Sequence, residues 1–187
     1  MKFLIIYLAF ALFLVNGCGS NLDDANRISI TLPDGRWVID DQMLETVRTG
    51  DYDNDWLFVA GIPSIMPGFS DPSIMISSTE ATGSVKVGEF VDMMIDSEAF
   101  GETFNLAGRY TSSIAGYPAE VLTFDVVPSN PQPGLNYASE SNLIAAYFLK
   151  NSRWYSVQCS AIYANSVADL DPCWNAAKTL EFYKETD

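Results

Sequence analysis

The sequence has no histidine and few basic residues. Ten lysines and arginines stand against 24 aspartates and glutamates, which gives a net charge of −14. Without histidine, catalysis by a Ser-His-Asp or Cys-His group and metal binding through imidazole are impossible. The excess of negative charge repels nucleic acid and anionic lipid headgroups, so we expect no nucleic-acid partner and no basic membrane-binding patch.

Long apolar segments are also lacking, apart from one near the N-terminus. Residues 3–15 form an unbroken run of 13 apolar residues that follows Lys2. Spanning a bilayer takes about 20 apolar residues. The run therefore has the length and the flanking charge of a signal-peptide core.

The apolar run ends in Val15-Asn16-Gly17-Cys18. This resembles the bacterial lipobox, with an apolar residue at −3, a small residue at −1 and the obligatory cysteine at +1. The resemblance implies a diacylglyceryl thioether on Cys18, cleavage after Gly17 and acylation of the new amino group, for example with palmitate. The alternative is a buried N-terminal helix in which Cys18 has no special role.

This motif predicts three segments of the chain and a cellular location. Residues 1–17 would be a cleaved signal peptide, 18–27 a lipidated tether and 28–187 a single domain. Two or three acyl chains anchor a protein far more firmly than one. We expect attachment to the extracytoplasmic side of a membrane. Gly19, which follows the lipidated cysteine, is not the aspartate that acts as a retention signal. In a bacterium with two membranes, the outer membrane is therefore favoured by analogy.

Cysteine is scarce, and its use follows from the lipobox. With Cys18 modified, Cys159 and Cys173 remain. An even remainder in an exported protein indicates a disulfide. Cys159 shares a predicted strand face with Val157 and Ala161, and Cys173 lies on the apolar face of a predicted helix. A Cys159–Cys173 bond would join the two elements; the alternative is two separate buried thiols.

Hydrophobic periodicity predicts an α+β domain. Period-two alternation indicates strands, and apolar residues three and four apart indicate helices. Residues 28–33 and 36–40 are expected to form a hairpin around the turn dipeptide Asp34-Gly35. Further strands are predicted at 56–60, 73–78, 104–114, 119–127, 142–149 and 153–163, with helices at 42–48, 85–100 and 164–183.

One acidic run has the beginning of a calcium-loop pattern. Asp51, Asp53 and Asp55 alternate as the first three ligands of an EF-hand do. Trp56 and Ile62 stand where such a loop needs glycine and glutamate. We therefore favour a solvated acidic turn over a calcium site.

Two short motifs and the order of elements resemble the PsbP-like superfamily. The motifs are Leu32-Pro33-Asp34-Gly35-Arg36-Trp37 and Ala115-Gly116-Tyr117-Pro118-Ala119. The resemblance implies an antiparallel β-sheet flanked by helices, an α/β/α sandwich. Members of the superfamily, among them the DcrB-like lipoproteins, act mostly as binding or assembly factors. The resemblance carries over no functional residue.

Together these patterns predict a lipid-anchored, non-catalytic envelope lipoprotein. We expect it to bind or help assemble another envelope component without a cofactor or metal. The alternative is a module for a small apolar ligand or lipid, with a cavity between sheet and helix lined by Phe90, Met94 and Trp174. An enzyme ranks last because the sequence has no catalytic motif.

Overall fold

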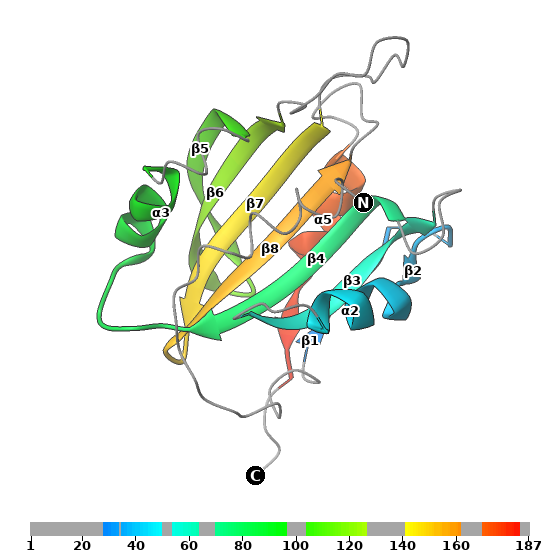
Figure 1. Ribbon diagram of the computed structural model, residues 1–187, viewed down its shortest axis with the longest axis horizontal. Coiled ribbons are helices and arrows are strands. Elements are labelled where there is room, and N and C mark those ends of the chain that lie inside the picture. The colour runs from blue at the N-terminus through cyan, green and yellow to red at the C-terminus, as the bar shows by residue number, and fades with distance from the viewer. Residues whose placement is uncertain are drawn as a thin grey trace.

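A single antiparallel sheet dominates the computed structural model (Figure 1), which describes residues 28–33, 35–49, 54–63, 70–96, 104–126, 141–161 and 170–183. The strands are β1 (Ile28–Ser29), β2 (Val38–Ile39), β3 (Asp55–Pro63), β4 (Ser70–Glu80), β5 (Phe104–Ile114), β6 (Tyr117–Val126), β7 (Ser141–Lys150), β8 (Arg153–Ala161) and β9 (Glu181–Phe182). The helices are α2 (Asp41–Arg48), α3 (Val87–Ile95) and α5 (Asp171–Ala177).

The strands form a large sheet and a small ribbon. The sheet has seven strands in the order β2-β3-β4-β8-β7-β6-β5, and β1 pairs with β9 in a separate two-stranded ribbon. All of these pairs are antiparallel. The β5–β6 and β7–β8 hairpins each turn through two residues, and Ala119 pairs with Phe148 in the shared register. Both turns therefore lie at the same end of the sheet.

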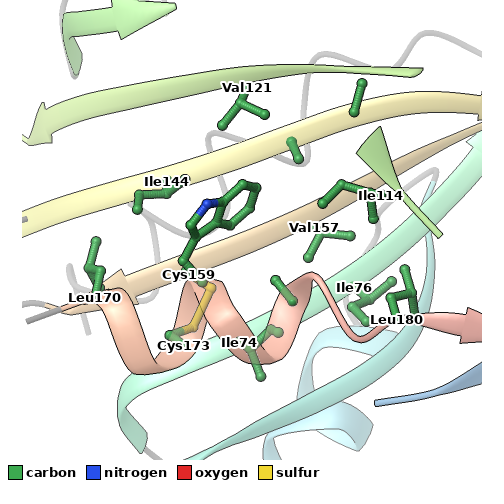
Figure 2. Close-up of a cluster of buried hydrophobic side chains, with 14 of the residues drawn as sticks. Ile74, Ile76, Ile114, Val121, Ile144, Val157, Cys159, Leu170, Cys173 and Leu180 are labelled. Atoms are coloured by element: carbon green, nitrogen blue, oxygen red, sulfur yellow. A yellow bond between two sulfur atoms is a disulfide. The ribbon is translucent and has the colours of Figure 1, made fainter. Parts of the chain in front are cut away.

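Alternate residues of the strands build a separate core on each face. Ile74, Ile76, Val157 and Cys159 face α5, whose buried side chains complete that core (Figure 2). The intervening residues face the opposite way. Here Val91 and Met94 of α3 pack on Leu122, Phe124 and Leu143, while Met43 and Leu44 of α2 pack on Trp56, Val59 and Met75.

Helices thus lie against both faces, as in the predicted arrangement, but they cover only parts of the sheet. Figure 1 shows α5 behind the sheet, α2 in front of β3, and α3 beside β6. The helices contain eight, nine and seven residues. In its described part the fold is a mostly antiparallel sheet with three helices, and an α/β/α sandwich describes it only loosely.

Most predicted elements are present, with shifted ends. The helix predicted at 85–100 spans Val87–Ile95, and residues 97–100 lie outside the described residues. The strands predicted from 56 to 163 are those of the sheet, mostly longer by a few residues. The helix predicted at 42–48 starts one residue earlier, where the Asp40 side chain accepts a hydrogen bond from the Met43 amide at 2.9 Å.

The predicted hairpin at residues 28–40 is wrong. β1 pairs with β9, so that Ile28 lies opposite Phe182, and β2 pairs with the edge of β3. Each of these strands has only two residues, so a local hairpin would form few hydrogen bonds. Pairing β1 with β9 instead lets Ile28 pack against the core on the α5 face.

The predicted C-terminal helix at 164–183 is too long. Residues 162–169 lie outside the described residues, and α5 is helical only from Asp171 to Ala177. Pro172 lies in the first turn, where its missing N–H costs no helical hydrogen bond. At the other end the amides of Thr179 and Leu180 bond three residues back, which tightens the last turn before the chain enters β9.

Two pairs of hydroxyl groups, one buried and one partly buried, join β4 to β8 in register. The Oγ atoms of Ser73 and Ser160 are 3.1 Å apart, and those of Ser77 and Ser156 are 3.0 Å apart. Gln158 donates to Ser156 Oγ at 3.2 Å. A slip of one residue would separate these pairs and turn the apolar residues to the other face.

Candidate functional site

A half-open cavity lies at the end of the sheet that carries both hairpin turns. Its volume is about 1050 Å³, which is large enough for a small organic ligand. We call it the end pocket. It is lined by Ser113, Ala115, Gly116, Tyr117, Lys150, Asn151, Tyr155 and the six residues 178–183.

Aromatic rings form one wall of the end pocket. Phe182 of β9 packs edge-on against Tyr155, with ring centroids 5.1 Å apart, and against Tyr117 at 6.1 Å. Behind them the ring of Phe148 stacks on Tyr155 at 5.2 Å. Tilted and offset rings at these distances pack favourably, so the wall is held in place by its own contacts.

Two lysines bring positive charge to the end pocket. The Lys150 ammonium lies 4.4 Å from the centre of the Phe182 ring, and the Lys178 ammonium lies 5.8 Å from that of Trp174. Lys178 also donates to the Asn175 side-chain oxygen at 3.2 Å. Among the described ion pairs neither lysine meets a carboxylate. Ring faces hold an ammonium in place without neutralising it.

The two hairpin turns form the rim opposite the C-terminal segment. Ala115 and Gly116 have φ angles of 52° and 82°, and Asn151 and Ser152 have 49° and 60°. Two successive positive φ angles define the tight turn that matches the twist of a hairpin. Alanine and serine rarely adopt this conformation. The hydrogen-bonded ladders of the flanking strands therefore hold the two turns in this conformation.

The predicted disulfide is present at some distance from the end pocket. Cys159 of β8 and Cys173 of α5 are bonded, with their Cα atoms 5.8 Å apart (Figure 2). Both residues are fully buried. The Cys173 sulfur touches the carbonyl oxygen of Ser73 at 3.4 Å, a contact without a hydrogen bond because a disulfide sulfur carries no hydrogen. The bond fixes α5 to the sheet.

The other predicted site residues lie mostly outside the described residues. Cys18, Asp51 and Asp53 are among them, so the lipid anchor and the calcium pattern stay predictions. Asp55 begins β3 and forms an ion pair with Arg153, whose Nη2 also donates to Ser78 Oγ at 3.0 Å. Across the described ranges, no three histidine, cysteine or acidic side chains gather as a metal site would require.

The structure corrects the cavity predicted for an apolar ligand. The ring of Phe90 stacks on Trp154 with centroids 4.4 Å apart, and Met94 packs in the same α3 core. Trp174 lies in the core on the other face of the sheet. The sheet itself separates Trp174 from Phe90 and Met94, so the three side chains cannot line one cavity.

Burial and ion pairing shift the pKa values of three groups outside the end pocket. Complete burial raises the pKa of Tyr147 well above its usual value. Partial burial raises the pKa of Tyr110, against the opposite effect of a hydrogen bond with Trp174. Hydrogen bonds to Asp92 and Glu120 raise the pKa of Arg109, which stays charged.

None of the residues that line the end pocket was predicted as a site from the sequence. Lys150 and Lys178 lie 28 positions apart, and the packing of Phe182 on Phe148 and Tyr155 brings residues 178–183 beside the β7–β8 turn. The chain contains only five lysines. That rarity in so acidic a protein is the one sequence signal that marks these two positions.

Of the comparisons with known proteins, only that with solved structures finds a match. No protein-family model matches the chain, and no curated protein does. Solved structures do match, and they show a PsbP-like fold. No helix in the described part of the chain is long and apolar enough to cross a membrane.

Two solved structures illustrate the likeness. The solution structure of cyanobacterial PsbP (CyanoP) from Synechocystis sp. PCC 6803 has a TM-score of 0.52 at 11% identity, covering 91% of this chain and 99% of CyanoP. The crystal structure of PA94, a protein of unknown function from Pseudomonas aeruginosa, has a TM-score of 0.50 at 16% identity, covering 70% and 82%. At such identities the likeness concerns the fold alone.

Proposed function

We propose that this protein is a lipid-anchored, non-catalytic binding or assembly factor for another component of the cell envelope. The end pocket carries the binding part of the proposal, because it combines concave shape, ring faces and unneutralised positive charge in one place. The PsbP-like fold agrees with an accessory role, since CyanoP shares it along nearly its whole length.

The location rests on two independent features. The segment from Lys2 to Cys18 has the pattern of a lipoprotein signal. The Cys159–Cys173 bond belongs to an oxidising compartment, as found outside the cytoplasm. In this proposal Cys18 holds the protein at the membrane, and the acidic domain stays off the anionic headgroups.

Photo-crosslinking in cells tests the binding function. A benzophenone amino acid at Tyr183 reports on the end pocket, and the same group at Met93 of α3 is the matched control. The two residues are exposed to 60% and 58%, and only Tyr183 lines the pocket. We expect one discrete adduct with an envelope protein from position 183 and none from position 93. No adduct from position 183, or the same adducts from both, would contradict the proposal.

Fatty-acid labelling tests the anchor separately. We expect the wild-type protein to take up a labelled fatty acid and the Cys18→Ser variant to take up none. Labelling that persists in Cys18→Ser would show that the lipobox interpretation is wrong. This outcome leaves the crosslinking result unaffected, because the pocket lies in the folded domain.

A small-ligand module is the second candidate. The predicted lining by Phe90, Met94 and Trp174 is excluded, but the aromatic wall of the end pocket supplies an apolar surface elsewhere. The chemistry of that pocket determines which ligands it suits.

A further inference from the structure

We propose that the end pocket binds a small organic anion, a carboxylate or phosphate attached to a flat apolar body. This inference rests on the proposed function only in that both use the same pocket. In it, Lys150 and Lys178 pair with the anionic group, and the rings of Tyr117 and Phe182 contact the apolar body.

The charge in the pocket is the first argument. Three arginines are already engaged: Arg48 donates to the carbonyl of Trp56, Arg109 pairs with Asp92 and Glu120, and Arg153 pairs with Asp55. Lys150 and Lys178 are placed by ring faces instead, which leaves their charge available. The local charge of the lining is positive even with Glu181 included, although the whole chain carries −14.

This contrast between pocket and surface favours anion selectivity. An anion is repelled over most of an acidic surface and attracted only where positive groups gather. Two ammonium groups on flexible stems suit a compact anionic group of variable geometry. A binding protein for a cation would instead place carboxylates here, and among the described residues of the lining Glu181 is the only one.

The walls are the second argument, and they exclude a bare inorganic anion as the best ligand. The partly exposed rings of Tyr117 and Phe182, backed by the buried ring of Tyr155, face a cavity of about 1050 Å³, far more space than phosphate fills. Removing ring surface from water contributes roughly 25 cal/mol per Å². A ligand that covers those rings gains this contribution, and phosphate alone cannot.

The two lysines also contribute to stability, and the experiment must distinguish this contribution from ligand binding. Lys178 follows the last residue of α5, where a cation stabilises the negative end of a helix. Lys150 packs on Phe182 and shields it. If only these roles existed, replacing the lysines would change the free energy of unfolding and leave ligand affinity unchanged.

The test is a titration of the purified lipoprotein in a zwitterionic detergent. The probes are 2-naphthoate, its neutral analogue 2-naphthylmethanol, and inorganic phosphate. Binding is followed by calorimetry and by amide NMR shifts of the lining residues Asn151 and Thr179. All affinities are compared at one detergent concentration, so that partition of the probe into micelles cancels between protein variants.

We expect 2-naphthoate to shift the lining amides and to bind at least about tenfold more tightly than 2-naphthylmethanol, as befits a ligand held by hydrogen bonds to charged groups. Lys150→Gln and Lys178→Gln should each weaken naphthoate binding about tenfold for the same reason. Lys86→Gln is the matched control, because it removes the same charge at the start of α3, away from the pocket. It should change the affinity less than about twofold, as expected for a screened surface charge.

Several outcomes would overturn the inference. These are no binding of naphthoate, shifts that map away from the pocket, equal affinity for the neutral alcohol, phosphate binding as tightly as naphthoate, or no loss in the Lys150→Gln/Lys178→Gln double variant. Urea unfolding confirms that each variant is folded. If naphthoate fails while the crosslink at position 183 persists, the ligand chemistry is wrong and the proposed function stands.

Discussion

Breaking the Cys159–Cys173 disulfide should lower the free energy of unfolding by about 3 kcal/mol. The two cysteines are 14 positions apart. In the chain-entropy model, a closed loop of this size restricts the unfolded chain by about 3 kcal/mol at 25 °C. For a chain of this length the corresponding fall in Tm is about 6–12 °C.

Two ways of removing the bond give different expected values. Reduction keeps both sulfur atoms in the core and removes only the covalent link. The Cys159→Ala/Cys173→Ala variant also leaves space where two fully buried sulfurs packed. That change should cost about 1 kcal/mol more for each sulfur. The double variant is therefore expected to be less stable than the reduced wild type.

Urea unfolding of three species checks these values: oxidised wild type, reduced wild type and the double alanine variant. Mass measurement after alkylation confirms the redox state of each sample. The m value should rise when the bond is absent, because the unfolded chain then exposes more surface. Two thiols that alkylate without reductant would show that the bond does not form. A fully reduced protein within about 1 kcal/mol of the oxidised one would refute the entropic reasoning.

Three further predictions concern single positions. Gly116→Ala should cost about 1 kcal/mol in unfolding free energy, because its φ of 82° is left-handed, whereas the Gly35→Ala control has open space and no such φ. The free energy of unfolding of the wild type should fall as the pH rises above about 10, and in Tyr147→Phe this fall should be smaller, as urea unfolding at alkaline pH would show. The reason is that the folded-state pKa of Tyr147 is raised, so its contribution to stability is complete below the unfolded-state pKa of about 10 and is lost as the pH rises through the folded-state pKa. Arg109→Gln should cost about 1 kcal/mol or less, since its ion pairs are partly exposed, and hydrogen exchange should speed up in α3 but not in α5. Equal unfolding free energies of the two glycine variants would contradict the first prediction. The same alkaline loss of stability in Tyr147→Phe as in the wild type would contradict the second, and equally fast hydrogen exchange in α3 and α5 of Arg109→Gln would contradict the third.

The sequence predicts the sheet well because its strands are long and buried on one or both faces. Alternation along β8 assigns Val157, Cys159 and Ala161 to one face. Together with the apolar face of the predicted helix that carries Cys173, this was enough to predict the Cys159–Cys173 bond. Both β4 and β8 also meet their neighbours over most of their length, so local pattern and tertiary packing agree.

Prediction failed where elements are two residues long. Asp34-Gly35 is a good turn signal, but β1 and β2 are too short for a turn to hold them together. The partner of such a short strand depends on where its apolar residues can be buried. Ile28 lies opposite Phe182, which is far away along the chain. Local sequence contains no information about such a partner.

The end pocket was missed for the same reason. Its lysines and rings come from two hairpins, the end of α5 and β9, and no spacing rule links them. Each residue taken alone is an ordinary surface lysine or core aromatic. Only the topology turns them into one site, whereas the disulfide followed from a count of cysteines and two periodic faces.

The pairing of β1 with β9 has a mechanical consequence. If the membrane anchor holds the chain at Cys18, any tension between membrane and domain enters the fold at β1. β1 is joined to β9 through only two residue pairs, Ile28 with Phe182 and Ser29 with Glu181. Glu181 and Phe182 also line the end pocket. Pulling on the tether would therefore strain the pocket wall before it reached the seven-stranded sheet, and a ligand bound there would raise the force at which the ribbon opens.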